Sequence, residues 1–396
     1  MFIKTQKKNR QKLTILFTTN HADTLGNACR LEMVDFLSRY FSTTVVTNKK
    51  DFVAGRYPSC DVVGYQNVKG KVLPIFEDIF EWRRIAKIIN TADSDLCFMF
   101  DDTSAIANFI KIPVFQYVHQ FGNRTIEQPN ILKRVYRIVA GLIIDSFYFS
   151  GLKKSEAIFV VSKPIIDILK AKGIHNLIHT PHGIELQKYN KPEINDFHLP
   201  LAQLKKNDHF IITYTGWVTD KRGFQLMLDS IKIITQHNNK VVLAVAGADK
   251  EFSKRISEFI IKNKLQNNII NFGVVDVSLI PGILYYSDVC LSFLDDVPAY
   301  RVSPPQKVIE YFAAGKPVVC NKIETHEWLV EHGKTGYITK MDTAEVANAV
   351  LKLMNNNDLY RQISVNALKE ANKYDINLIY GNIVDTINKK PNQTLP

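Results

Sequence analysis

Short apolar segments alternate with longer amphipathic segments along this chain, and the alternation runs twice. Apolar runs of about four to eight residues with no polar face are typical of strands that are buried on both sides. Strands that alternate with helices predict parallel sheets covered by helices, so the pattern indicates an α/β fold. The 396 residues, 46% of them hydrophobic, can bury two cores, and we therefore expect two domains.

The expected elements fall into two groups. Strands are expected at 13–18, 43–47, 96–100, 113–118 and 157–161, and then at 209–214, 240–246, 268–272, 288–293, 317–320 and 336–339. Helices are expected at 27–40, 79–90 and 130–149, and then at 223–236, 251–264, 278–286, 305–314, 343–354, 357–371 and 375–389. A polar stretch with Pro192 and Pro200 separates the groups and predicts a hinge. The expected division is an N-terminal domain over 1–190, a hinge over 191–208, a C-terminal domain over 209–374 and a last helix over 375–390.

The net charge of +11 is unevenly distributed along the chain. Residues 1–200 contain 27 Lys and Arg against 19 Asp and Glu, a net charge of +8. A basic N-terminal half favours contact with anionic lipid headgroups or with a phosphorylated acceptor. Nucleic acid is not an expected partner, because the chain has no zinc-finger, basic-zipper or RNA-binding aromatic motif.

Two further features bear on the cellular compartment. The chain has no run of about eighteen apolar residues, and the apolar stretch LTILF after the basic N-terminus is too short for a signal peptide. The five cysteines have no C-x-x-C spacing, which predicts neither a disulfide framework nor a zinc site. We therefore expect a cytoplasmic protein, with peripheral contact at the inner face of a membrane as an option.

The run 303–319, SPPQKVIEYFAAGKPVV, carries the clearest chemical signal. Its two prolines favour a helix start, Gly315 favours a helix end, and an apolar strand follows. The helix start offers backbone N–H groups, the Ser303 hydroxyl and the Lys307 cation, which together suit a diphosphate. One turn further on, Glu310 is an acceptor for ribose hydroxyls. An ordinary surface helix with an ion pair between Lys307 and Glu310 is the alternative.

The turn after the expected strand 209–214 shows a second anion-binding pattern, TGWVTDKRGF. Gly216 allows the backbone to turn tightly and to approach a ligand. Lys221 and Arg222 precede a glycine and a helix, so a cation there can face a diphosphate that gains charge as its glycosidic bond breaks. A solvated Lys–Arg pair at a helix start is the alternative.

These two segments resemble the donor site of retaining nucleotide-sugar glycosyltransferases of the family-4 type, the glycosyl transferases group 1. That family has two facing Rossmann-like domains, the GT-B fold, and a donor-site string P-x-K-x-x-E-Y-x-A-x-G-x-P-V-V. This chain matches the string from Pro305 to Val319. The resemblance covers most of 209–389 and, more loosely, 13–190. It implies parallel sheets and a C-terminal helix that crosses back to the N-terminal domain.

Two departures from the family pattern concern the sugar and the phosphates. Many members carry an acid eight positions before the glutamate of the string, where this chain has Val302. In the G-R-x(n)-K-G motif that holds the phosphates, Arg222 matches the lysine but Trp217 replaces the arginine. The cations available to compensate are Lys221, Arg301 and Lys307.

The remaining site residues are implied chiefly by the resemblance. Gly247 ends a strand as in the family's x-x-G-x-G segment, and relatives contact the nucleobase with backbone groups at the position of Val274. His119 lies just beyond a buried strand, where parallel sheets place ligand groups, and the family has a histidine there that hydrogen-bonds the donor sugar. His21 and Gly26 lie in the loop where relatives admit the acceptor. A turn glycine and a structural histidine are the alternatives for Gly247 and His119.

Two other patterns are not assigned to the site. The acidic pairs Asp101–Asp102 and Asp295–Asp296 lack the DxD spacing, and the family generally needs no metal there, so we expect no metal or other cofactor. The basic-flanked amphipathic segment 132–154 has the pattern of an interfacial helix. We expect it to be a helix of the N-terminal domain whose basic end can touch a bilayer.

The sequence therefore predicts an enzyme that moves a sugar from a nucleotide diphosphate to a hydroxyl of a glycan or lipid-linked acceptor. Arg222, Lys307 and the helix start stabilise the leaving diphosphate, and the resemblance implies that His119 positions the sugar and that the anomeric configuration is retained. Two alternatives stay open: a nucleotide-sugar epimerase on the same scaffold, and a catalytically silent sugar-nucleotide-binding subunit. A Rossmann dehydrogenase is not expected, because no G-x-G-x-x-G follows any expected strand.

Overall fold

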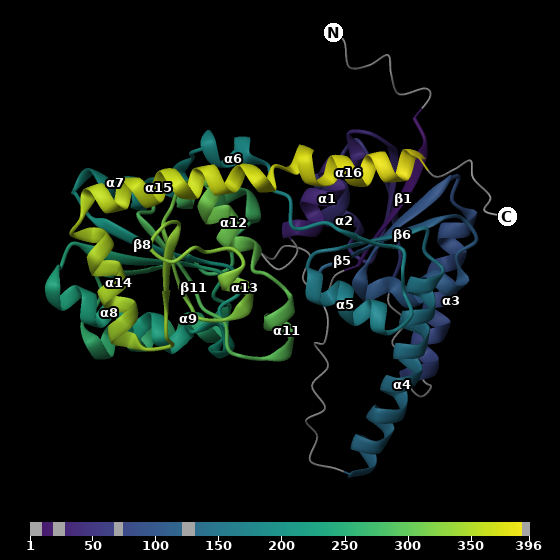
Figure 1. Cartoon of the computed structure of the whole chain (residues 1–396), viewed down its shortest axis with the longest axis horizontal. Helices are drawn as coiled ribbons and strands as arrows, with labels where there is room; N and C mark the ends of the chain where they lie inside the picture. The colour runs from purple at the N-terminus through teal and green to yellow at the C-terminus, as the bar shows by residue number, and fades with distance from the viewer. Residues whose placement is uncertain (1–9, 19–27, 67–73, 121–130, 390–396) are drawn as a thin grey trace, which may run out of the picture. The chain divides into compact units, whose positions relative to one another are not determined.

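The computed structural model describes residues 10–18, 28–66, 74–120 and 131–389. The chain divides into two compact units (Figure 1). The N-terminal unit contains the described residues of Met1–Ala22, Arg30–Pro181 and Ile379–Pro396, and the C-terminal unit contains Ala28, Cys29 and His182–Leu378. Each unit is built on one parallel sheet with helices beside it, which confirms the expected fold class.

The N-terminal unit has a seven-stranded sheet in the order β3-β2-β1-β4-β5-β6-β7, and neighbouring strands are parallel. Its strands are β1 (Lys12–Phe17), β2 (Ser42–Thr47), β3 (Asp61–Gly64), β4 (Leu96–Phe100), β5 (Val114–Val118), β6 (Ala157–Val160) and β7 (Leu177–His179). Its helices are α1 (Ala28–Ser38), α2 (Lys50–Arg56), α3 (Pro74–Thr91), η3 (Asp101–Phe109), α4 (Ile131–Lys153) and α5 (Lys163–Ala171).

The C-terminal unit has a six-stranded parallel sheet in the order β10-β9-β8-β11-β12-β13. Its strands are β8 (Phe210–Thr215), β9 (Val241–Ala246), β10 (Ile269–Asn271), β11 (Val289–Ser292), β12 (Val318–Asn321) and β13 (Gly336–Thr339). Its helices are α6 (Leu186–Asn190), η4 (Asp196–His198), α7 (Leu199–Lys206), η5 (Asp220–Arg222), α8 (Phe224–His237), α9 (Lys250–Asn263), η6 (Val277–Leu279), α10 (Ile280–Tyr286), α11 (Pro298–Val302), α12 (Gln306–Ala313), α13 (Glu324–Glu327), α14 (Thr343–Met354), α15 (Asn357–Ala371) and η7 (Asn372–Tyr374).

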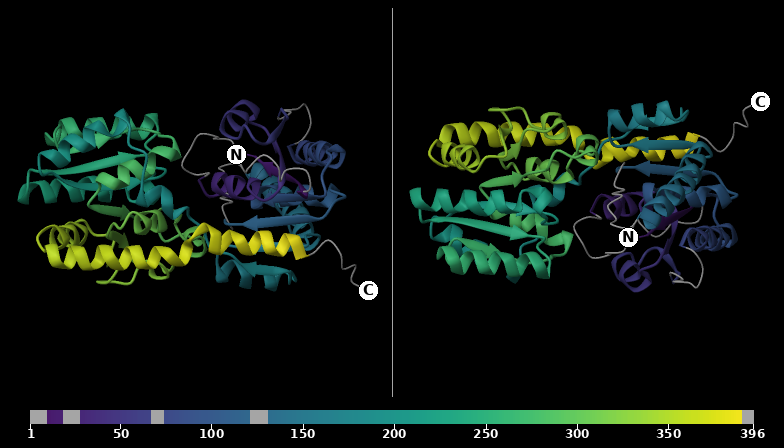
Figure 2. Two further views of the ribbon diagram at one scale, coloured as in Figure 1. Left: turned by 90° about the horizontal axis from the view of Figure 1, so that it is seen from above. Right: turned by 90° about the horizontal axis from the view of Figure 1, so that it is seen from below.

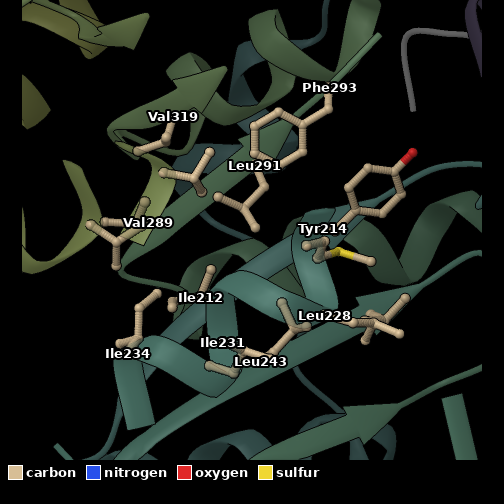
Figure 3. Packing of buried hydrophobic residues seen from close by; sticks show 14 of the residues in the cluster. Ile212, Tyr214, Leu228, Ile231, Ile234, Leu243, Val289, Leu291, Phe293 and Val319 are labelled. Carbon is tan, nitrogen blue, oxygen red and sulfur yellow. The ribbon is translucent and has the colours of Figure 1, made fainter. Parts of the chain in front are cut away.

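Both faces of the C-terminal sheet are buried. On one face, Ile212 and Tyr214 of β8 pack with side chains of α8 such as Leu228 (Figure 3). On the other face, Ile211 packs with Val308 of α12. Figure 2 shows helices on both sides of this sheet. Burial on both faces removes the alternation of polar and apolar residues, which explains the nearly continuous apolar runs in the sequence.

The last helix, α16 (Ile376–Lys389), belongs to both units (Figure 1). At its start, the Ile376 N–H donates to the carbonyl oxygen of Ile184 at 2.9 Å in the C-terminal unit. Further along, Tyr380 is fully buried in the N-terminal unit, and its ring centroid lies 5.8 Å from that of Phe36 and 6.4 Å from that of Tyr117. The expected crossing of the C-terminal helix back to the N-terminal domain is confirmed.

The segment 191–208, which we expected to be a hinge, is largely folded into η4 and α7. Asn195 Oδ1 accepts a hydrogen bond from the Phe197 N–H at 3.2 Å, and Pro200 lies in the first turn of α7. The residues that suggested a break therefore start helices here, as Asn and Pro do when they occupy cap and first-turn positions. His198 Nε2 lies 3.1 Å from the carbonyl oxygen of Leu279, which connects the segment to the C-terminal unit.

Sequence reasoning missed the strands β3 and β7 and several short helices. β3 is an edge strand with mostly exposed side chains, and β7 is an edge strand of only three residues, so neither produces an apolar run. The missed helix η3 packs closely on α4, because a Cβ at Gly151 would lie 1.9 Å from the carbonyl oxygen of Ser104. None of the helices in the described part of the chain is long and apolar enough to span a lipid bilayer.

Candidate active site

The candidate donor site lies in the C-terminal unit, where the strand order changes direction between β8 and β11. In open parallel sheets, ligands bind beyond the carboxyl ends of the strands at such a point. Gly216 directly follows β8, and the chain after β11 leads through α11 to the start of α12. The two segments that the sequence analysis singled out therefore meet at one edge of the sheet.

Helix α12 is fixed against this edge by its buried face and by Tyr311. The Tyr311 Oη accepts hydrogen bonds from the N–H and the Oγ1 of Thr215 at 3.0 and 3.1 Å. The same hydroxyl donates to the carbonyl oxygen of Leu291 at 3.3 Å. Tyr311 therefore joins the helix to the ends of β8 and β11. The apolar side chains that face the sheet are Val308, Ile309 and Phe312.

The Lys307 ammonium is buried at this edge and has no hydrogen-bond partner among the residues that the structure describes. The residue is 9% exposed, and its Nζ lies 3.7 Å from the centroid of the Tyr214 ring, whose face attracts a cation. Burial, together with the positive charge of Arg222, lowers the pKa of Lys307 well below its usual value, and Glu310 opposes this effect. Because a buried cation without an anion is costly, this position favours the binding of an anion.

Because Gly216 has no side chain, the space beside it is free for the Lys307 side chain. Its φ of +102° is a conformation that residues with a Cβ rarely adopt. A Cβ at this position would lie 3.1 Å from Nζ and 3.2 Å from Cε of Lys307. The backbone at Gly216 therefore lies close to the lysine of the donor-site string. The expected approach of this backbone to a ligand stays a prediction.

Two hydroxyl groups in the same segments are also buried without a partner. Ser303 Oγ belongs to the residue that follows α11, and Thr219 Oγ1 lies in the loop after β8. Leaving a buried hydroxyl unsatisfied costs about 1–3 kcal/mol. A phosphate group accepts hydrogen bonds with several oxygens, so it is suited to hydroxyls of this kind.

Arg222 is the last residue of η5, and Tyr300 holds its guanidinium. Arg222 Nε donates to Tyr300 Oη at 3.4 Å, and the guanidinium carbon lies 5.5 Å from the centroid of the same ring. Asp220, two residues earlier, pairs with both terminal nitrogens of Arg255 at 3.0 and 2.7 Å, which fixes the loop. Arg222 is half-buried, whereas the neighbouring Lys221 is exposed.

Glu310 lies one turn beyond Lys307 on α12 and is half-buried. Burial raises the pKa of its carboxyl group to about 7, against the influence of the Lys307 ammonium. Lys307 makes no hydrogen bond to it, so the two residues do not form the ion pair of an ordinary surface helix. Glu310 is thus an acceptor beside the anion site, and its charge changes near neutral pH.

Three other predicted donor residues lie beyond the strands of the C-terminal sheet. Gly247 directly follows β9, has a φ of +124°, and donates its N–H to the Gly273 carbonyl oxygen at 2.7 Å. Val274 follows that glycine and is exposed. Arg301, in α11, is exposed and already forms a two-point ion pair with Asp296.

In the N-terminal unit, His119 directly follows β5 and is buried. Its Nδ1 lies 3.1 Å from Oδ1 of Asp101, which also pairs with Arg30 Nη2 at 3.1 Å. The second oxygen of Asp101 accepts a hydrogen bond from the Gln120 N–H at 2.9 Å. Burial alone would raise the pKa of Asp101, but these three partners outweigh it and lower the pKa to about 2. The charged Asp101 therefore fixes the orientation of the His119 ring.

Sequence reasoning missed the residues that support the predicted ones. They are Tyr214 beneath Lys307, Tyr300 beside Arg222 and Asp101 beside His119. Each supporting residue comes from a different segment than the residue it holds, so no local motif joins the two. The predicted acceptor-side residues His21 and Gly26 lie outside the described residues.

Comparison with solved structures identifies the architecture. The crystal structure of Anabaena Alr3699/HepE in complex with UDP and glucose matches this chain with a TM-score of 0.73 and 15% sequence identity, over 96% of this chain and 100% of that chain. At this level of identity the likeness establishes the fold alone. The protein has the GT-B architecture, with two parallel-sheet α/β domains.

Sequence comparison finds similarity to glycosyltransferases over part of the chain. Residues 200–370 match the family described as Glycosyl transferases group 1. The capsular polysaccharide biosynthesis glycosyltransferase CapM of Staphylococcus aureus is 27% identical over 206 residues, which are 50% of each protein. The chitobiosyldiphosphodolichol beta-mannosyltransferase of Candida albicans is 25% identical over 197 residues, which are 48% of this chain and 42% of that protein. The chain spans about half the length of the curated relatives it matches, and its similarity to the group 1 family extends over residues 200–370.

The unpartnered ammonium predicts that Lys307→Met stabilises the protein without ligand. Methionine fills a similar apolar space and removes a charge that the folded state disfavours. Because the pKa is lower in the folded than in the unfolded protein, the wild type loses stability as the pH falls from about 10.4 toward the folded pKa. We therefore expect a gain in unfolding free energy of about 1–2 kcal/mol at neutral pH, which disappears near a pH of about 10.5.

Unfolding by heat and by urea, measured from neutral to alkaline pH, checks this expectation. The matched control is Lys340→Met, which removes an exposed ammonium from the same unit. Equal effects of the two substitutions, or a gain that does not shrink at alkaline pH, would show that Lys307 carries no burial penalty.

Proposed function

We propose that this protein transfers a glycosyl group from a nucleotide diphosphate sugar to an acceptor hydroxyl. The observation that carries the proposal is the buried Lys307 ammonium without a partner, on which the charge of Arg222 acts. Together with the unpartnered Ser303 hydroxyl, these cations suit a diphosphate, whose charge rises as its bond to the sugar breaks. The group 1 family match of the same segment supports the proposal.

We propose a UDP-sugar as the first candidate donor, because the HepE structure, which has the same fold, holds UDP and glucose. Glu310 would accept hydrogen bonds from the ribose hydroxyls. The backbone at Gly216, Gly247 and Val274 would approach the phosphates and the base. Lys221 and Arg301 are the further cations assigned to the donor.

In the proposed reaction, the bond between the anomeric carbon and the diphosphate oxygen breaks while the acceptor hydroxyl attacks from the same face. The anomeric configuration is therefore retained. Arg222, Lys307 and the N-terminus of α12 stabilise the departing diphosphate, which takes the acceptor's proton. His119, oriented by Asp101, positions the sugar. The proposal includes no metal or other cofactor, because these cations meet the developing charge.

We propose a glycan or a lipid-linked glycan as the acceptor and the cytoplasm as the place of reaction. The support is the names of the relatives, one a capsular polysaccharide biosynthesis glycosyltransferase and one a chitobiosyldiphosphodolichol mannosyltransferase. Both point to polymeric or lipid-carried sugars as acceptors in this family.

Turnover with a panel of UDP-, GDP- and dTDP-linked sugars and a mixed pool of glycan and glycolipid acceptors tests the class of activity. We expect nucleotide release that depends on an acceptor, and a product whose anomeric configuration, read by NMR, matches the donor. Release of nucleotide with an altered free sugar and no acceptor would identify an epimerase. Donor binding without turnover would identify a silent sugar-nucleotide-binding subunit.

Replacing Glu310 tests the ribose contact. Glu310→Ala should weaken UDP affinity by about 2–4 kcal/mol, the loss of one or two hydrogen bonds to a charged group. Because ribose hydroxyls donate to the ionised carboxylate, uridine affinity in the wild type should rise with pH through about 7 and should be flat in Glu310→Gln. Calorimetry or NMR titration measures both, with the exposed Glu258→Ala as control. UDP and uridine affinities that do not change in these variants would remove Glu310 from the site.

Replacing Arg222 tests the stabilisation of the leaving group. Arg222→Ala should lower kcat about 10²–10³-fold, as for the loss of one donor to a developing anion, and should change donor affinity much less. The exposed Lys232→Ala on α8 is the control. Assays run with EDTA should show full wild-type activity. A loss confined to donor affinity would assign Arg222 to binding alone, and inhibition by EDTA would show that a metal takes part.

Membrane contact is the last part of the proposal. Val139, Leu142 and Ile143 are exposed apolar side chains on α4, and residues 1–200 carry a net charge of +8. Exposed apolar side chains beside basic charge suit an anionic bilayer surface. We expect the protein to sediment with vesicles that contain anionic lipid and not with neutral vesicles, and Leu142→Glu to weaken this binding.

The control for membrane contact is Ile261→Glu on α9. Leu142 and Ile261 are 66% and 71% exposed, so the two substitutions change equally accessible side chains in different units. Contact through α4 would be contradicted if the protein bound neutral vesicles as well as anionic ones. It would also be contradicted if the two substitutions had equal effects.

A further inference from the structure

The N-terminal unit contains a pocket of about 170 Å³ at the carboxyl end of its own sheet. Thr18, Asn48 and Tyr65 line it and directly follow β1, β2 and β3, and Asp102 lies two residues after β4. This edge includes the point between β1 and β4 where the strand order changes direction, which is where open parallel sheets bind ligands. None of the proposed donor residues lines this pocket.

Helix α3 forms one wall of the pocket. Asp78, Glu81 and Trp82 line it and are spaced as i, i+3 and i+4, so they lie on one face of the helix. The Trp82 ring packs against Phe147 of α4, with the ring centroids 5.5 Å apart, which holds the indole in place. The wall therefore combines carboxylates with an immobilised aromatic surface.

Tyr65 adds a hydroxyl to the pocket wall. It is 9% exposed, it lines the pocket, and no hydrogen bond joins its hydroxyl to the residues that the structure describes. Burial raises the pKa of Tyr65, and the charges of Glu81 and Asp102 raise it further, so the hydroxyl stays protonated. The hydroxyl in the pocket wall can therefore donate a hydrogen bond to a ligand.

The described lining of the pocket has an excess of negative charge. Asp78, Glu81 and Asp102 belong to it, whereas no lysine or arginine among the described residues does. Arg30 Nη1 lies 3.1 Å from Asp102 Oδ2, and Arg84 lies 3.8 Å from Glu81, so the two arginines balance part of this charge from behind the wall. Ionised carboxylates only accept hydrogen bonds, so the pocket favours a ligand with several hydroxyl donors and disfavours an anion.

We propose that this pocket binds the terminal sugar ring of the acceptor and that this ring is a pyranose without negative charge. The inference rests on the proposed function and adds the substrate class on the acceptor side. A protein cavity of about 150 Å³ holds benzene, so this pocket fits one six-membered ring. The ring's hydroxyls donate to Glu81 and Asp102 and accept from Tyr65, while its C–H face packs on Trp82. Among the residues that the structure describes, no three His, Cys, Asp or Glu side chains group to hold a metal ion instead.

Saturation-transfer NMR on the whole protein tests the charge of the ligand. Methyl glycosides of glucose, galactose, mannose and N-acetylglucosamine are compared with methyl glucuronide and glucose 6-phosphate at equal concentration. We expect saturation of at least one neutral glycoside, with an affinity about tenfold or more above that of the anionic sugars, the effect of one unfavourable charge contact. Anionic sugars that bind as well as the neutral ones would overturn the inference.

Two conservative variants test the residues. Tyr65→Phe removes one hydroxyl and should lower the affinity for the neutral glycoside about five- to tenfold. Glu81→Gln keeps the shape of the wall. It should reduce the difference between the affinities for neutral and for anionic sugars. Glu258→Gln, at an exposed site in the other unit, should change neither quantity. Unchanged affinity in Tyr65→Phe would overturn the inference.

A measurement of UDP binding distinguishes failure of this inference from failure of the proposed function. If UDP stabilises the protein against heat while no neutral glycoside binds, the pocket inference is wrong and the donor proposal stands. If a neutral glycoside binds while no nucleoside diphosphate does, the proposed transferase activity fails and the pocket is still a sugar site. Thermal stabilisation by Ca²⁺ or Mg²⁺ that disappears in Glu81→Gln would make the pocket a cation site and overturn the inference.

Discussion

The donor site of the C-terminal unit depends on a positive charge held in the interior. The Lys307 ammonium lies on the face of Tyr214 and against the backbone of Gly216, and no hydrogen bond to a described residue satisfies it. Such a charge persists only where the surrounding structure is firmly held. Tyr311 provides that support, because it joins the helix that carries the lysine to the ends of two strands. An anion that binds there offsets the cost of burial.

The two units have the same sheet topology, but the residues that follow their strands differ in charge. In each parallel sheet the order of the strands reverses near the centre, and polar residues follow the strands at that edge. In the C-terminal unit these residues are cations and hydroxyls, such as Arg222 and Ser303. In the N-terminal unit they include the carboxylates of Asp101 and Asp102. The fold thus provides the location of a site, and the few residues beyond the strands decide its chemistry.

The sequence predicted what is encoded locally and missed what is assembled across segments. The helix from Gln306 to Ala313 and the strands beside it follow from periodicity, proline and glycine, because each signal lies within the element itself. The edge strands β3 and β7 have no apolar run and gave no signal. The support of His119 by Asp101, and the pocket around Tyr65, join residues from separate elements. One sequence without spatial information cannot pair such residues.

The helix α16 has a consequence for the synthesis of this protein. Ribosomes make a chain from its first residue to its last, and domains generally fold as they emerge. Here Tyr380, which is fully buried against Phe36 and Tyr117, is translated after the segment His182–Leu378 of the C-terminal unit. The N-terminal unit therefore cannot complete its hydrophobic core until that segment has been made, although most of its own residues are made first. Until α16 emerges from the ribosome, Phe36 and Tyr117 lack the side chain that packs on them.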